Sequence, residues 1–162
     1  MQKSSNSLIW RHRRENLKKC SLRGLEKLPY LTFYTYPIQA LPPLDNVIVL
    51  KVGAPLLTPA DRGKQLLLVD GTWRLAELMQ RQLSSLVSSL EARSLPPGLR
   101  TAYPRRQTEC PDPEAGLASI EALYVAHLIL GMPTEHLLDA YPWREAFLQK
   151  NHQVLSDSIC ST

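Results

Sequence analysis

The stretch Leu66-Leu67-Leu68-Val69-Asp70-Gly71-Thr72-Trp73-Arg74-Leu75-Ala76-Glu77-Leu78-Met79 predicts a buried strand, a tight turn and a helix. Four apolar residues between polar flanks suit a strand that is covered on both faces. Asp70-Gly71 ends the run, and Thr72 is placed to cap the helix that follows. Apolar residues then recur at helical spacing as far as Leu90. A strand that leads into a helix in this way is the unit of an α/β fold.

The turn places two chemically useful side chains together. Asp70 stands at the carboxyl end of the strand, and Trp73 lies in the first turn of the helix. Open α/β sheets bind ligands at the carboxyl ends of their strands. A carboxylate and an indole there suit a ligand that carries an amino group and a soft cation such as a sulfonium. A purely structural interpretation also fits, in which Asp70 is a turn residue and Trp73 anchors the core.

The rest of the chain alternates apolar runs with helical patterns, which predicts an α/β fold with a mainly parallel sheet and flanking helices. Strands are expected over residues 7–10, 31–36, 47–50, 66–69 and 99–102. Further helices are expected over residues 22–28, with Ser21 as their N-cap, and over 117–130, 134–141 and 142–150. Residues 11–19 are too charged for a core, and a frayed tail is expected at 152–162. We therefore expect one domain over residues 7–151, with a basic segment at 1–30 packed on it.

The composition limits the class of protein. Its 162 residues fit one domain, and no apolar run approaches the ~20 residues that a membrane-spanning helix needs. The N-terminus lacks the long apolar core of a signal peptide. Cys20, Cys110 and Cys160 form no C-x-x-C pair, which favours reduced cysteines, no structural metal and a cytoplasmic location.

Positive charge is concentrated near the N-terminus. The whole chain carries a net charge of +4, whereas residues 1–27 hold eight Lys or Arg and two Glu, a surplus of six positive charges. A basic block beside a ligand site suggests a polyanionic partner such as nucleic acid. A merely solvated surface is the alternative interpretation. Arg105 and Arg106, in a proline-rich segment at 103–116, are also candidates for phosphate contact.

Common catalytic motifs are absent from the sequence. It contains no G-x-x-x-x-G-K-[ST], G-x-G-x-x-G or G-x-S-x-G. Its four histidines have no metal-ligand spacing, and His127, within an apolar helix, suits packing or the surface better than catalysis. This pattern favours a reaction whose electrophile arrives already activated, such as alkyl transfer from a sulfonium cofactor, in which the protein mainly positions the reactants.

Several short motifs resemble those of known families. Asp70-Gly71-Thr72-Trp73-Arg74-x-Ala76 resembles the D-[GT]-T-W-x-x-A signature of the DTW-domain family, and residues 117–122 resemble its [LA]-S-x-[IVL]-E-A helix start. The chain is also similar to the small-subunit ribosomal RNA aminocarboxypropyltransferases. That similarity lies in Lys19-Cys20-Ser21, the proline-containing loop at 55–61 and Trp143…Phe147…Asn151. Together the resemblance covers residues 8–151.

This resemblance implies a fold and a reaction. The fold would be SPOUT-like, with a C-terminal trefoil knot that forms the cofactor pocket. The reaction would transfer the 3-amino-3-carboxypropyl (acp) group of S-adenosylmethionine (SAM) to N3 of a uridine or pseudouridine in RNA. The resemblance favours a monomer and slightly favours rRNA over tRNA, because many DTW proteins carry an N-terminal cluster of zinc-binding cysteines and this chain has only Cys20 there.

The resemblance also suggests roles for individual residues. Asp70 would pair with the ammonium of SAM or, as an alternative, assist deprotonation of N3, and Trp73 would pack against the methyl group and the sulfonium. The other predicted cofactor-binding residues are Ser21, Leu50, Leu99, Leu117, Ala118 and Ser119. The predicted RNA-phosphate contacts are Arg11, Arg13, Lys18, Lys19, Arg105 and Arg106.

Two other functions fit the same sequence. A SPOUT-type RNA methyltransferase would use the same cofactor and present its methyl carbon instead of the γ-carbon. A non-catalytic RNA-binding or ribosome-assembly protein would keep the fold and have no measurable affinity for SAM. The mass of the added group separates the first alternative from acp transfer, and cofactor affinity separates the second.

Overall fold

The computed structural model describes residues 6–14, 20–86, 90–104 and 116–160. Within them five strands form one sheet in the order β2-β1-β4-β3-β5, and every pairing is parallel. The strands are β1 (Ser7–His12), β2 (Leu31–Tyr36), β3 (Val47–Leu50), β4 (Gln65–Asp70) and β5 (Glu91–Arg93). This arrangement confirms the α/β fold with a parallel sheet and flanking helices that the sequence predicts.

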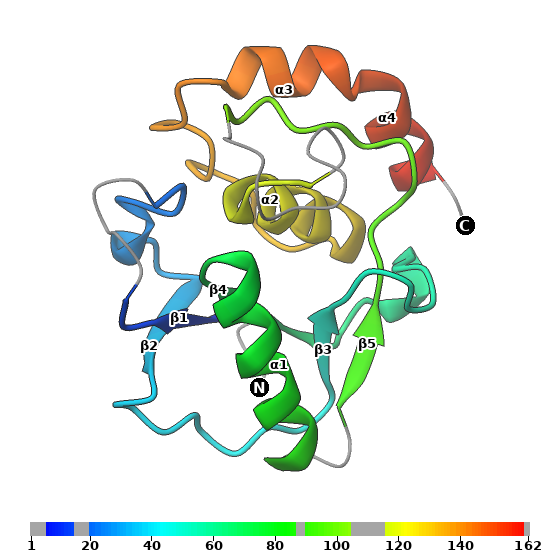
Figure 1. The fold of residues 1–162 in the computed structure, drawn as a ribbon. Coiled ribbons are helices and arrows are strands. Elements are labelled where there is room, and N and C mark those ends of the chain that lie inside the picture. Colours follow the sequence, from blue (N-terminus) through cyan, green and yellow to red (C-terminus); the bar gives the residue numbers. More distant parts are fainter. Residues whose placement is uncertain (1–5, 15–19, 87–89, 105–115, 161–162) are drawn as a thin grey trace.

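Helices cover both faces of the sheet (Figure 1). Helix α1 (Trp73–Leu86) packs Met79 and Leu83 on one face, where they meet Leu8 and Leu67 of the central strands. Helix α2 (Ser119–Leu130) lies on the other face within a larger apolar cluster. Helices α3 (Arg144–Lys150) and α4 (His152–Cys160) lie beyond α2 (Figure 1).

The alternation of side chains along the central strands explains these two layers. Ile9 and Leu68 point to the α2 side, whereas Leu8 and Leu67 point to the α1 side, and all four are at most 5 % exposed. Burying both faces requires the near-continuous apolar runs that the sequence shows. The carboxyl ends of β1 and β4 then lie next to each other, between α1 and the start of α2 (Figure 1).

Several sequence predictions were wrong about local structure. Residues 22–28 form only the short 3-10 helix η1 (Leu25–Lys27), because Gly24 adopts a left-handed conformation with φ of 88°. Residues 134–141 form turns, and His136 has φ of 67°, which a helix cannot contain. Residues 99–102 form no strand, whereas Glu91–Arg93 do, as an edge strand beside β3.

Two further corrections concern charge and the chain end. Arg11 and His12 belong to β1 and are 8 % and 6 % exposed, although their segment was expected to be too charged for a core. The predicted frayed tail contains α4 instead, and Leu155 of that helix packs into the core at 8 % exposed. In the part of the chain that the structure describes, no helix is both long enough and apolar enough to span a membrane.

Candidate functional site

The site is built around Asp70, the last residue of β4. Its side chain lies on the α2 side of the sheet, and Asp70 is only 2 % exposed. Arg11 lies directly opposite on the neighbouring strand, in the register that pairs β1 with β4. The topology therefore places a buried carboxylate and a buried guanidinium side by side at the carboxyl edge of the sheet, where open α/β sheets bind ligands.

Three donors converge on the Asp70 carboxylate. Arg11 Nε donates to Oδ2 over 3.1 Å, and the Cys20 thiol donates to the same oxygen over 3.3 Å. The Ser119 hydroxyl donates to Oδ1 over 2.8 Å. Asp70 thus joins β1, β4, the segment before η1 and the first turn of α2. A carboxylate accepts at about four positions, and among the described residues Oδ2 has two donors and Oδ1 has one.

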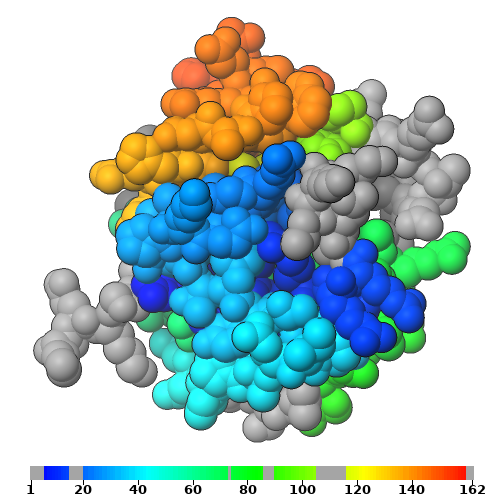
Figure 2. All heavy atoms as spheres, turned by 90° about the vertical axis from the view of Figure 1, so that its left-hand side faces the viewer, coloured from blue at the N-terminus to red at the C-terminus, as the bar shows by residue number. Residues whose placement is uncertain are grey.

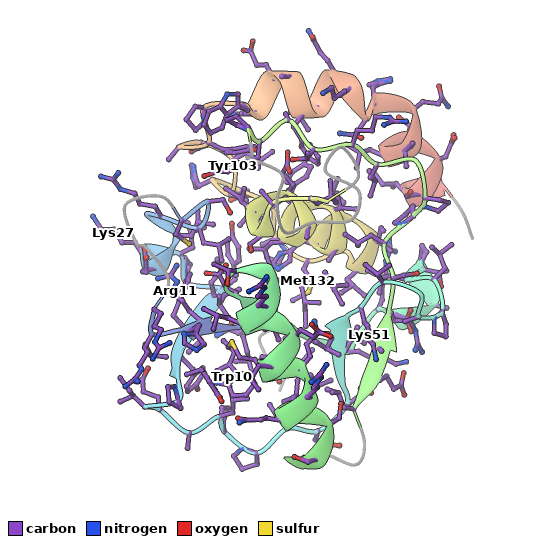
Figure 3. The ribbon with its side chains drawn as sticks, viewed as in Figure 1. Trp10, Arg11, Lys27, Lys51, Tyr103 and Met132 are labelled. Atoms are coloured by element: carbon purple, nitrogen blue, oxygen red, sulfur yellow. The ribbon has the colours of Figure 1, made fainter. Side chains whose placement is uncertain are left out.

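Arg11 is held on several sides. Its Nη1 donates to Glu26 over 3.1 Å, and its guanidinium carbon lies 4.6 Å from the centre of the Phe33 ring. Burial acts to lower the pKa of Arg11, but the hydrogen-bonded carboxylates of Asp70 and Glu26 raise it, and the pKa lies above its ordinary value. Figure 3 shows Arg11 inside the fold, whereas Lys27 lies at the outer side. The predicted contact of Arg11 with RNA phosphate therefore does not fit its position, because its guanidinium is already engaged within the site.

Cys20 is a buried thiol of this network. Burial, together with the neighbouring charge of Asp70, raises the pKa of Cys20 to about 12. The group is consequently a protonated thiol at neutral pH, which agrees with its role as a donor to Asp70. Cys20 is a residue that the sequence analysis did not assign to the site, although it lies within the Lys19-Cys20-Ser21 motif.

Ser21, the residue after Cys20, forms a hydrogen bond with the start of α2, the helix that also contains Ser119. Its hydroxyl accepts from the backbone N–H of Ile120 in the first turn of α2, over 3.2 Å. The expectation that Ser21 caps a helix over 22–28 was wrong, because it serves α2 instead. The structure thus brings three predicted cofactor-binding residues, Ser21, Asp70 and Ser119, to one place from distant parts of the chain.

A second buried carboxylate, Glu121, lies one helical turn after Ala118. It is 0 % exposed and accepts from Thr101 Oγ1 at 2.6 Å, from the backbone N–H of Ala102 at 2.9 Å and from that of Ala118 at 2.8 Å. The Tyr141 hydroxyl is its fourth donor, at 3.0 Å. Glu121 therefore ties the loop at 99–103 to the start of α2.

The remaining predicted cofactor-binding residues are apolar and lie in or against the cluster on the α2 side of the sheet. Leu99 and Ala118 are buried at 5 % and 1 % exposed, whereas Leu50 and Leu117 are half-buried. The carbonyl of Leu50 accepts from the side chain of Gln80 over 3.2 Å. Trp73 begins α1 three residues after Asp70, and its side chain lies outside the described part of the structure.

Of the predicted RNA contacts, only Arg13 is both described and exposed. Lys18, Lys19, Arg105 and Arg106 lie outside the described residues. Arg14, Arg23 and Lys27 are further exposed cations of the N-terminal segments, and Figure 2 shows these segments, in blue, on one face of the molecule. No group of three or more His, Cys, Asp or Glu suited to a metal ion is found among the residues that the structure describes.

An aromatic cluster lies at the far end of the loop at 99–103. The rings of Tyr103 and Trp143 meet edge to face at 5.2 Å between centroids, and Tyr141 and Trp143 do so at 5.7 Å. Asn151 holds the same loop, because its side chain bonds both the N–H and the carbonyl of Arg100. Sequence reasoning noted Trp143 and Asn151 only as parts of a motif and gave them no structural role.

Fold and site together define the class: an α/β protein whose parallel sheet presents a buried polar network at the carboxyl ends of its central strands. The chain is similar to a solved structure, that of the SAM-dependent rRNA:acp-transferase Tsr3 from Vulcanisaeta distributa. The two agree with a TM-score of 0.73 and 25 % sequence identity, over 96 % of this chain and 83 % of that chain. A scan against protein-family models and a search of curated proteins gave no match. The DTW and SPOUT assignments and the trefoil knot therefore stay predictions.

Proposed function

We propose that this chain uses SAM to transfer the 3-amino-3-carboxypropyl group to N3 of a uridine or pseudouridine in RNA, with rRNA favoured over tRNA. The observation that carries the proposal is the convergence of Ser21, Asp70 and Ser119 in a fold that resembles a SAM-dependent rRNA:acp-transferase along 96 % of the chain. The DTW and SPOUT relationships, the knot, and action as a monomer belong to the same proposal.

The chemistry of the donor set fits SAM. Its ammonium needs an acceptor such as Oδ1 of Asp70. Its carboxylate needs a donor such as the Ser21 hydroxyl, and its ribose hydroxyls can donate to the oxygen of Ser119. Its adenine needs apolar surface, which half-buried Leu50 and Leu117 provide. When bound, SAM supplies a γ-carbon made electrophilic by the sulfonium, with methylthioadenosine as the leaving group.

The residues of the chain then act mainly by orientation. Asp70, held by three donors, keeps a fixed direction and aligns the amino end of the cofactor. Trp73, at the start of α1, would pack its ring against the methyl group and leave the γ-carbon to face the RNA. Since Asp70 already accepts from a guanidinium, a thiol and a hydroxyl, alignment of the cofactor suits it better than contact with N3.

RNA would approach over the face on which the basic N-terminal segments lie (Figure 2). Arg13 is placed for phosphate contact because it is exposed directly after β1, and Lys18, Lys19, Arg105 and Arg106 complete the proposed set. Charge reversal at Lys18 and Lys19 should weaken RNA binding and reduce its salt dependence. If charge reversal changes only the stability of the fold, this basic block is structural.

The test is mass spectrometry of nucleosides from rRNA and tRNA, purified separately from a strain that lacks this gene and from its parent. Loss of an acp-modified nucleoside from rRNA supports the proposal, and loss from tRNA corrects the acceptor. Loss of a methyl mark alone would show a methyltransferase. If no nucleoside changes and the purified chain has no affinity for SAM, the chain is a non-catalytic RNA-binding protein.

Trp73 offers a sharper test with the purified protein. Trp73→Ala should weaken SAM binding or lower turnover by about tenfold or more, through loss of the ring that packs against methyl and sulfonium. Leu78→Ala is a matched control on the same helix, because Leu78 is 45 % exposed. Wild-type binding and turnover in Trp73→Ala would remove Trp73 from the site.

A further inference from the structure

Glu121 is the most completely hydrogen-bonded carboxylate of the site. It is 0 % exposed, and its two oxygens accept from Thr101, Ala102, Ala118 and Tyr141 at 2.6 to 3.0 Å. All four partners are donors. A carboxylate offers about four acceptor positions, so this environment matches its acceptors better than the amide of a glutamine, the side chain of the same size.

Helix capping explains only part of this arrangement. Glu121 is the third residue of α2, and its bond from the N–H of Ala118 is the half of a capping box that a carboxylate at this position supplies, since the alanine side chain cannot return a bond. The other three donors come from outside the helix, two from the loop at 99–103 and one from Tyr141. Keeping a carboxylate fully out of water is costly unless it is hydrogen-bonded, so the loop and Tyr141 are needed to stabilise it there.

The bonded segments carry residues that are predicted to bind the cofactor, Leu99 in the loop and Leu117 to Ser119 at the start of α2. Thr101 and Ala102 follow Leu99 directly, and Ala118 lies between Leu117 and Ser119. Residues 105–115 separate the two segments along the chain, and the Glu121 side chain joins them in space. The next residue after Ala118, Ser119, in turn donates to Asp70. One side chain thus sets the distance between the two backbone walls of the proposed pocket.

We propose that Glu121 is a positioning residue for SAM: it holds the loop at 99–103 and the start of α2 at the separation that fits the adenosine, without touching the reacting atoms. This inference rests on the proposed function, because it assigns a role within that cofactor site. It predicts that a change in Glu121 affects cofactor affinity much more than the rate of the chemical step.

Glu121→Gln tests this with almost no change in volume. The amide turns acceptor positions into N–H donors that face the donors of the loop, so about two of the four bonds are lost. We expect SAM affinity, measured by calorimetry, to fall about tenfold or more, and kcat at saturating SAM to stay within about threefold. Tyr141→Phe, which removes one donor and leaves the carboxylate intact, should cost less than Glu121→Gln.

The outcomes separate this inference from the function on which it rests. Circular dichroism checks that Glu121→Gln is folded. If the wild-type protein binds SAM and the folded variant binds it equally well, Glu121 is merely structural. In that case this inference fails, whereas the proposed function stands. If wild-type protein binds no SAM, both fail. If Glu121→Gln does not fold, Thr101→Val removes one bond to the carboxylate at nearly constant shape. A folded Thr101→Val with unchanged SAM affinity would overturn the inference, and a several-fold loss with unchanged kcat would support it.

Discussion

Arg11 and Asp70 form an ion pair across β1 and β4, with 3.1 Å between Nε and Oδ2, and their side chains are only 10 % and 3 % exposed. Both residues stand at the carboxyl edge of the sheet, in direct register. Both charged groups are buried, and hydrogen bonds replace their lost contacts with water. Glu26 also accepts from Arg11, whereas Cys20 and Ser119 also donate to Asp70. Such a pair holds the site together only while both partners are present, because a lone buried charge is strongly unfavourable.

Asp70→Ala should therefore lower the free energy of unfolding by about 3–5 kcal/mol, the usual cost of leaving a buried charge without its partner. Urea denaturation measures this change. Replacing both partners, with Arg11→Met and Asp70→Ala, should cost less than the sum of the single changes. Glu77→Ala is the matched control, because the Glu77–Arg81 pair on α1 is 55 % and 75 % exposed and should contribute under about 1 kcal/mol. Equal costs for Asp70→Ala and Glu77→Ala would contradict this account.

His127 should make the fold sensitive to acid. It is 0 % exposed, and its Nδ1–H donates to the carbonyl of Pro133, which leaves Nε2 to accept from the Ser7 hydroxyl over 2.7 Å. Burial lowers the pKa of His127 below its ordinary value of 6.5, although the bond to Pro133 acts to raise it. The unfolded chain therefore binds a proton below pH 6.5 that the folded chain does not bind.

The sign of the effect follows from this difference. Stability is retained above pH 6.5 and is lost as the pH falls below it, by up to about 1.4 kcal/mol per pH unit, until the folded histidine also titrates. Urea denaturation at pH 7.5, 6.5 and 5.5 measures this slope. His127→Gln can keep both hydrogen bonds and carries no titrating group, so it should show a smaller slope. Identical slopes in the two proteins would rule out His127 as the cause.

Cys20 should be unreactive in the folded protein. Burial raises the pKa of Cys20 to about 12, so very little thiolate is present at pH 8, and the residue is only 6 % exposed. Alkylation by iodoacetamide at pH 8, assigned to Cys20 by peptide mass spectrometry, should be at least about a hundredfold slower in native protein than in urea. A native rate close to that of the unfolded chain would show that the thiol is accessible and ionised.

Four of the five described strands could be predicted from sequence because their runs of apolar and β-forming residues are unambiguous. Residues 31–36 and 47–50 form strands with the predicted bounds, and the predicted 66–69 strand extends by one residue at each end. A strand that is buried on both faces has a continuous apolar run, which can be recognised without knowing which strands lie beside it. Glu91–Arg93 gave no such signal, because an edge strand of three residues with two charges has no apolar pattern.

The polar network was harder to predict, because the bonds to Asp70 and the bond from Ile120 to Ser21 join residues 49 to 99 positions apart. Asp70 could be identified as a candidate because the apolar run before it predicts a strand, and the carboxyl end of a strand is where ligands bind. Arg11 was interpreted as a surface cation because its segment is basic, whereas tertiary structure gives it a carboxylate partner and a buried place. The residues around Cys20 do not indicate its bond to Asp70, because only the fold brings the two together. The same holds for Glu121 and its partners in the loop at 99–103.

Asn151 provides the last test, of the support behind that loop. It is 0 % exposed; its Oδ1 accepts from the N–H of Arg100 over 2.7 Å, and its Nδ2 donates to the carbonyls of Arg100 and Phe147, each over 2.8 Å. Asn151→Asp keeps the shape but turns the donor into an acceptor that faces two carbonyls. Asn151→Asp should therefore destabilise the fold more than Asn151→Ala, and each by about 2 kcal/mol or more in urea denaturation. Gln153→Ala, at an exposed position of α4, should change stability by under about 0.5 kcal/mol. If Asn151→Asp were as stable as wild type, the amide would not hold the loop, because an aspartate cannot supply the two N–H donors that the carbonyls require.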